Sequence, residues 1–172
     1  MPPKRALQAA ASILVESSYV LPIDVEAIAA SHDVSVVRQD LEDSVSGVLV
    51  MKEGRGIIGV NANHHPNRQR FTIAHELGHY LLHPEASEVF VDRSPVFFRD
   101  SNSGEGVDQR EMDANAFAAE LLMPKKDLIE LLDNQPIDAF DDVSVRRLSA
   151  RFGVSVQALT IRLTTLGLVS EL

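Results

Sequence analysis

The feature that most constrains this chain is the pentapeptide His75-Glu76-Leu77-Gly78-His79. On an α-helix, residues four apart share a face, so His75 and His79 can present ring nitrogens to one metal ion. Glu76 then lies beside the pair, where its carboxylate can hold a metal-bound water molecule and accept its proton. The spacing therefore predicts a helix that carries a metal-dependent hydrolytic site.

The residues around the pentapeptide predict that this helix is buried. A desolvated helix excludes unpaired charges, and these neighbours are all uncharged: Thr72, Ile73, Ala74, Leu77, Gly78, Tyr80 and Leu81. The alternative is a surface helix whose two histidines have ligand spacing by chance. The apolar flanks favour the metal site.

A catalytic zinc ion takes three protein ligands and keeps a fourth position for water. His83 continues the four-residue series, but it lies about 12 Å along the helix axis from His75, too far to share an ion bound at about 2 Å. We interpret His83 as a cap or as a residue that supports a ligand. The glycine and third histidine of a metzincin are also missing after the motif.

The third ligand is expected within residues 108–124, a strong helix pattern that ends at a proline. Glu111 shares a helical face with Ala114, Asn115 and Ala118. The small residues on this face let the helix approach the histidine helix closely. From this face, Asn115 can hydrogen-bond a ligand imidazole and fix its tautomer. Glu111 is therefore the preferred candidate.

Other readings of the same segment stay open. Asp108-x-x-Glu111 can instead be a capping pair at the start of the helix. Spacing alone does not choose among carboxylates, which leaves three lesser candidates for the metal: Glu105, Asp108 and Asp113.

Together the two motifs resemble the ImmA/IrrE family of bacterial and phage metallopeptidases. The matching residues are Phe71-Thr72-Ile73-Ala74-His75-Glu76-Leu77-Gly78-His79, Glu111-x-x-Ala114-Asn115-x-Phe117-Ala118 and Leu121-Leu122-Met123-Pro124. The resemblance implies a zincin-like fold in which His75, His79 and Glu111 bind zinc and Glu76 is the catalytic carboxylate. Better-known members cleave helix-turn-helix repressors of the Xre type, which releases prophage, mobile-element or stress-response genes. Asp113 departs from the glutamate or glutamine of many relatives, and we expect its side chain to point away from the metal.

Composition narrows the class of protein. A chain of 172 residues with 45% hydrophobic residues is long enough for one domain, or one domain with a small appendage. The net charge of −9 and pI near 5.0 disfavour a general nucleic-acid binder. The absence of cysteine excludes disulfides and thiolate zinc sites. Without a secretory signature or a run long enough to span a membrane, we expect a cytoplasmic protein.

The N-terminal part is expected to be helical. Leu7, Ala11, Leu14 and Val15 recur at helical spacing, which indicates an amphipathic helix rather than a targeting segment. A second helix is predicted over residues 21–30, with Pro22 close to its start.

Strand patterns then follow over residues 34–38, 47–51 and 56–61. We expect them to form a small antiparallel sheet, whose edge strand can pair with an extended substrate. Gly54-x-Gly56-x-x-Gly59 matches the dinucleotide-binding pattern, but the glycines lie in a hairpin instead of opening a helix, so we predict no nucleotide site. His64 and His65 are interpreted as solvated loop histidines, with a position facing the active site as the alternative.

Residues 84–107 are the least regular segment, with short strands expected over 89–91 and 96–98 and a polar loop over 100–106. Because the segment joins the two ligand-bearing helices, we expect it to border the substrate cleft. Phe97 and Phe98 are candidates for a binding wall or for the core. Three residues are candidates for stabilising the tetrahedral intermediate: Tyr80, His83 and Arg99.

The C-terminal part is predicted to hold a helix over 125–132 and then a pattern over 145–163 that resembles a helix-turn-helix, with Ser149 four residues before Gly153. The pattern contains no acidic residue and four arginines: Arg146, Arg147, Arg151 and Arg162. Tight helix packing needs the same small residue and glycine, and many members of the family end in a similar segment. We therefore favour a structural role over DNA contact.

The expected fold is α+β and zincin-like, with a small antiparallel sheet on a helical core and a C-terminal helix-turn-helix-like segment. Residues 1–142 would form the peptidase core, and residues 143–172 would pack on it. The expected function is a Zn2+-dependent endopeptidase, with Mn2+ as a substitute in vitro, that cleaves a cytoplasmic Xre-type repressor. The alternative is a module on the same scaffold that holds a repressor or DNA without hydrolysis.

Overall fold

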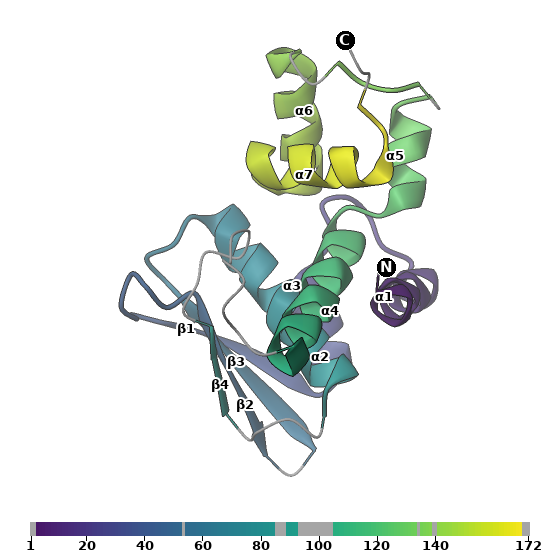
Figure 1. Cartoon of the computed structure of the whole chain (residues 1–172). Helices are drawn as coiled ribbons and strands as arrows, with labels where there is room; N and C mark the ends of the chain where they lie inside the picture. Colours follow the sequence, from purple (N-terminus) through teal and green to yellow (C-terminus); the bar gives the residue numbers. More distant parts are fainter. Residues whose placement is uncertain are drawn as a thin grey trace.

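The structure is a computed structural model that describes residues 3–52, 54–84, 89–92, 105–133, 135–138 and 141–169. Its elements are α1 (Lys4–Ser17), α2 (Val25–Ser31), β1 (Val34–Gln39), β2 (Gly47–Lys52), β3 (Arg55–Asn61), α3 (Pro66–Leu82), β4 (Val89–Asp92), α4 (Glu105–Leu122), α5 (Lys125–Leu131), α6 (Asp142–Phe152) and α7 (Val156–Leu166). Figure 1 shows the sheet on one side of α3 and α4, and the last three helices grouped beyond the end of α4. The fold is α+β.

The sheet has the strand order β1-β3-β2-β4 and is mixed. β2 is antiparallel to β3 and β4, but β1 pairs with β3 in parallel, so the prediction of an antiparallel sheet is wrong at this edge. β1 and β2 are consecutive in the chain but are not neighbours in the sheet. β3, which follows β2, lies between them and pairs with both. The side chain of buried Asn61 holds this connection by donating to three carbonyl oxygens: those of Leu41, Glu42 and Val45.

The first two helices are present, with differences in detail. α1 buries Ala6, Ala10, Ile13 and Leu14, whereas Val15 is 84% exposed, so the predicted apolar face is rotated from the observed one. Small alanines decide this face because they let α1 pack closely against α4. α2 begins later than predicted, because the Asp24 side chain caps it by accepting from the amide of Ala27.

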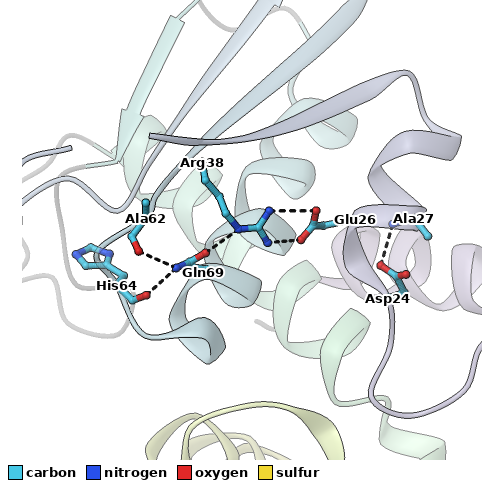
Figure 2. Close-up of polar contacts among 7 residues, drawn as sticks. All are labelled: Asp24, Glu26, Ala27, Arg38, Ala62, His64 and Gln69. Carbon is cyan, nitrogen blue, oxygen red and sulfur yellow. Dashed lines mark hydrogen bonds and ion pairs between the residues drawn. The ribbon is translucent and has the colours of Figure 1, made fainter. Parts of the chain in front are cut away.

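The start of α3 is fixed by a polar network drawn in Figure 2. Gln69 donates to the carbonyl oxygens of Ala62 and His64, which closes the loop before the helix. Arg38 of β1 donates to Gln69 and to the carboxylate of Glu26 in α2. The network joins α2, β1 and α3 at the surface, where the side chains of Arg38 and Glu26 are 51% and 43% exposed.

Pro66 is the first residue of α3, and the ring of exposed His65 caps the helix by accepting from the amide of Asn67. The Nε2 atom of His64 lies 3.2 Å from the carbonyl oxygen of Asp43. His64 therefore contacts the loop that contains Asp43, and His65 caps α3.

The C-terminal helices pack on the same core as the rest of the chain. Val145, Leu148, Phe152, Leu159 and Leu163 belong to one hydrophobic cluster with residues of α1 to α4. Two polar side chains of α3 also hold the turn between α6 and α7: Asn67 donates to the carbonyl of Val154, and Arg70 to that of Gly153. The division of the chain at residue 142 stays a prediction.

The predicted helix over 125–132 and the strand over 89–91 are present as α5 and β4. The expected strand over 96–98 lies outside the described residues, together with Phe97, Phe98 and Arg99. Gly54 lies in the turn before β3, and Gly56 and Gly59 lie within that strand. Among the described residues, no helix is long and apolar enough to cross a membrane.

Candidate metal centre

The histidine motif lies in the middle of α3, and the side chains of its two histidines and its glutamate are all buried. His75 is 1% exposed, Glu76 0% and His79 3%. The Nε2 atoms of the two histidines are 3.0 Å apart, as the four-residue helical spacing predicts. Two imidazole nitrogens at this spacing can supply two of the four ligands of a tetrahedral metal site.

Glu111 of α4 reaches this point from the neighbouring helix. Its Oε2 lies 3.5 Å from Nε2 of His75, and its Oε1 lies 3.5 Å from Nε2 of His79. A tetrahedral ion with bonds of about 2.0–2.1 Å separates its ligands by about 3.3 Å. The three side chains therefore have the donor types and the spacing that zinc needs, and among the described residues they are the only such group of histidine and acidic side chains.

Close contact between α3 and α4 makes this reach possible. A Cβ atom placed on Gly78 would lie 3.1 Å from the Cα atom of Ala114 and 3.1 Å from Cδ1 of Phe117. Glycine at this position lets the two helix backbones meet, as the run of small residues near Glu111 predicted. The helix itself begins at Glu105, so Asp108 lies inside it, and the interpretation of Asp108-x-x-Glu111 as a capping pair is wrong.

Asn115 supports the site in the predicted way. Its Oδ1 lies 3.0 Å from Nδ1 of His75. With the amide oxygen as acceptor, Nδ1 carries the hydrogen, which leaves the Nε2 lone pair free to face Glu111 and His79.

The remaining sequence candidates lie elsewhere. His83 is the C-terminal cap of α3, and its Nε2 is 3.5 Å from Oδ2 of Asp113. Burial lowers the pKa of His83, and the charge of Asp113 opposes that shift. Asp113 also accepts from Gln109, so it points away from the histidine pair. The side chains of Glu105 and Asp108 lie outside the described residues.

Tyr80 does not join the cluster. Its hydroxyl donates to the carbonyl oxygen of Gly54 at 2.8 Å, and its ring packs against Gly56. The ring of His83 lies beside that of His79, with their centroids 6.2 Å apart, but among the described residues neither Tyr80 nor His83 belongs to the His75, His79 and Glu111 group.

One neighbour of Glu76 had no signal in the sequence. A Cβ atom on Gly47, the first residue of β2, would lie 3.3 Å from Oε1 of Glu76 and 2.5 Å from Cγ2 of Thr72. The start of β2 therefore forms the wall against which Glu76 lies. Such a contact between a strand and a distant helix leaves no local pattern in the chain.

Comparison with known proteins agrees with this geometry. Residues 29–164 match the pattern of the IrrE N-terminal-like domain, peptidase family M78. The chain belongs to the ImmA/IrrE family of metallopeptidases. It is 26% identical over 136 residues to metallopeptidase ImmA of Bacillus subtilis (strain 168), covering 79% of this chain and 72% of that one. It is also 31% identical over 97 residues to uncharacterized immunity region protein 2 of Bacillus phage phi105, covering 56% of each.

A solved structure, a Mycobacterium tuberculosis transcriptional regulator, has the same fold with a TM-score of 0.65 and 22% identity. The alignment covers 94% of this chain but only 46% of the regulator. The chain thus spans about half the length of this protein and of the phage protein.

Proposed function

We propose that this protein is a zinc-dependent endopeptidase with His75, His79 and Glu111 as the metal ligands and Glu76 as the catalytic carboxylate. The observation that carries the proposal is the convergence of two imidazoles and one carboxylate within 4.8 Å, beside a fully buried glutamate. Zinc bound there would act as a Lewis acid that polarises the scissile carbonyl and acidifies water.

The protein residues would divide the remaining work. Glu76 accepts the proton of the attacking water and then delivers it to the leaving amine. Asn115 holds the ring of His75 in the tautomer that keeps Nε2 available. Burial of Glu76 and both histidines keeps bulk water away from the proton transfer.

The proposed substrate is a cytoplasmic Xre-type helix-turn-helix repressor, whose cleavage would derepress prophage, mobile-element or stress genes. This follows the family resemblance, and two relatives are named metallopeptidase ImmA and immunity region protein 2. Zn2+ is the proposed metal, and Mn2+ should substitute in vitro.

The test is to incubate the purified protein and zinc or manganese with a repressor encoded beside its gene. We expect discrete fragments with the native chain and none with the Glu76→Gln variant, which keeps the fold and the three proposed ligands. Equal cleavage by the variant would remove Glu76 from its role. A native chain that cleaves no such repressor would reject the proposed substrate.

A second candidate is a module that binds a repressor or DNA without hydrolysis. Exposed Arg146, Arg147 and Arg151 on α6 favour it, whereas buried Arg162 is bound to Glu120 and to the carbonyl of Met123. We propose a structural role for α6 and α7. Salt-dependent binding to duplex DNA that is lost when the three exposed arginines are replaced would favour the second candidate.

A further inference from the structure

Thr72 lies on α3 one turn before Glu76, and its hydroxyl is buried without a hydrogen bond to any described residue. The residue is fully buried, and among the described residues its Oγ1 has no hydrogen-bond partner. A buried hydroxyl without a partner destabilises the folded state, so its presence in a native core calls for an explanation.

The other three threonines of the chain provide an internal comparison, because all of them are also helical. Each lies in α7 and donates to the carbonyl oxygen four residues earlier, at distances of 3.0, 2.9 and 2.8 Å for Thr160, Thr164 and Thr165. This is the usual local hydrogen bond of a threonine in a helix. For Thr72 the corresponding acceptor is the carbonyl of Arg68, and the bond is not made.

Packing against β2 accounts for the difference. The methyl group of Thr72 fills the space beside Gly47, where a Cβ atom would approach it to 2.5 Å. The residue before β2 is held in place, since the carbonyl oxygen of Ser46 accepts from the amide of Asn61 at 3.0 Å and its hydroxyl accepts from the guanidinium of Arg68 at 2.8 Å. With the methyl group fixed there, the hydroxyl takes a rotamer that does not reach the Arg68 carbonyl.

The same glycine also borders Glu76, whose Oε1 would lie 3.3 Å from a Cβ atom at position 47. Thr72 and Glu76 are therefore adjacent on one helical face, against one point of the sheet. We propose that Thr72 is a positioning residue for Glu76: its hydroxyl donates to one ordered water molecule, which hydrogen-bonds the Glu76 carboxylate and holds it in the orientation that accepts a proton. This inference rests on the proposed peptidase function.

The first test separates the hydroxyl from the shape of the side chain. Thr72→Val keeps the shape and removes the hydroxyl, and Thr72→Ser keeps a hydroxyl. We expect Thr72→Val to lower kcat about tenfold with KM unchanged, and Thr72→Ser to stay within about threefold of the native kcat. Zinc content should be native in both variants. The melting temperature of Thr72→Val should be equal to or above the native value, because the hydroxyl has no protein partner to lose.

Three outcomes would overturn the inference. A native kcat in Thr72→Val would show that the hydroxyl is not used. A fall in both kcat and melting temperature would show that the hydroxyl serves the fold, and equal losses of kcat in the valine and serine variants would point to packing. If the native chain cleaves no peptide at all, the proposed function fails. If the native chain is active and Thr72→Val keeps its kcat, only this inference fails.

The second test uses Gly47. Gly47→Ala should lower kcat because the added Cβ displaces the Thr72 methyl group, and the double variant Gly47→Ala/Thr72→Ser should recover activity because serine lacks that methyl group. Gly59→Ala on the adjacent strand is the matched control, since the nearest atom to its Cβ would be 3.8 Å away. A fully active Gly47→Ala protein, or a double variant no better than Gly47→Ala, would contradict the proposed arrangement.

Discussion

Oδ1 of Asn115 lies 3.0 Å from Nδ1 of His75, on the ring nitrogen that faces away from His79 and Glu111. The contact joins α4 to α3 at the proposed ligand itself. It also selects one of the two neutral tautomers of His75, which the spacing of the histidines leaves open.

Replacement of Asn115 by alanine should therefore weaken zinc binding about 10- to 100-fold, the usual effect of removing a partner that orients a ligand histidine. Competition with a chromogenic chelator measures the affinity. Asn115→Asp keeps an acceptor oxygen and is the matched control, with affinity closer to the native value. An alanine variant that binds zinc like the native chain would show that the contact does not orient His75.

Glu111 and Asp113 lie two residues apart on α4, yet of these two only Glu111 belongs to the candidate metal-binding group. Glu111→Gln should abolish tight zinc binding, because it replaces the only charged donor of the three, whereas Asp113→Asn should bind one zinc ion per chain. Metal analysis after dialysis distinguishes them. Loss of zinc in the Asp113 variant with retention in the Glu111 variant would reverse the assignment.

The contact of Gly78 with α4 predicts a sensitive position. Gly78→Ala inserts a Cβ atom 3.1 Å from the Cα atom of Ala114 and 3.1 Å from Cδ1 of Phe117, so the helix backbones must separate and the side chain of Phe117 must move. We expect a loss of about 1–3 kcal/mol in the free energy of unfolding, as for overpacked cores, together with weaker zinc binding. Urea denaturation measures the first effect. Wild-type stability and zinc affinity in this variant would show that the two helices can move apart freely.

Arg162 and Glu120 form a buried ion pair between α7 and α4, with side chains 5% and 14% exposed. Arg162→Met leaves Glu120 without its cation and should reduce the free energy of unfolding by about 3–5 kcal/mol. Arg147→Met on the exposed face of α6 is the control and should change stability by about 0.5 kcal/mol or less. Similar effects of the two substitutions would argue against attachment of the C-terminal helices through this pair.

The environment of Tyr19 predicts that the free energy of unfolding falls at alkaline pH. Burial, together with its hydrogen bond to Asp127, raises the pKa of Tyr19 above its ordinary value of 10.0. The folded state thus favours the neutral phenol, so this contribution is complete below about pH 10 and is lost as the pH rises further. Urea unfolding at about pH 8 and about pH 11 should show a smaller alkaline loss for Tyr19→Phe than for the native chain. An equal loss in both would assign the pH dependence to other groups.

The sequence by itself determined the parts of the site that depend on local geometry. Residues four apart on a helix share a face whatever surrounds them, so His75 and His79 had to meet once this stretch became helical. The hairpin of β2 and β3 and the end of α4 before Pro124 also follow from nearby residues, because turn and helix-stop signals act over a few positions.

The sequence favoured Glu111 among several carboxylates, and only the tertiary structure shows its carboxylate oxygens 3.5 Å from the two histidines. Helical spacing already places Glu111 and Asp113 on different faces of α4, and the close approach of Gly78 to Ala114 brings Glu111 within reach of the pair. Three other features were also decided only by the tertiary structure: the parallel pairing of β1 with β3, the buried face of α1 and the contact of Gly47 with Glu76. Each depends on a partner far away in the chain, and such long-range contacts leave no periodic signal in the residues that make them.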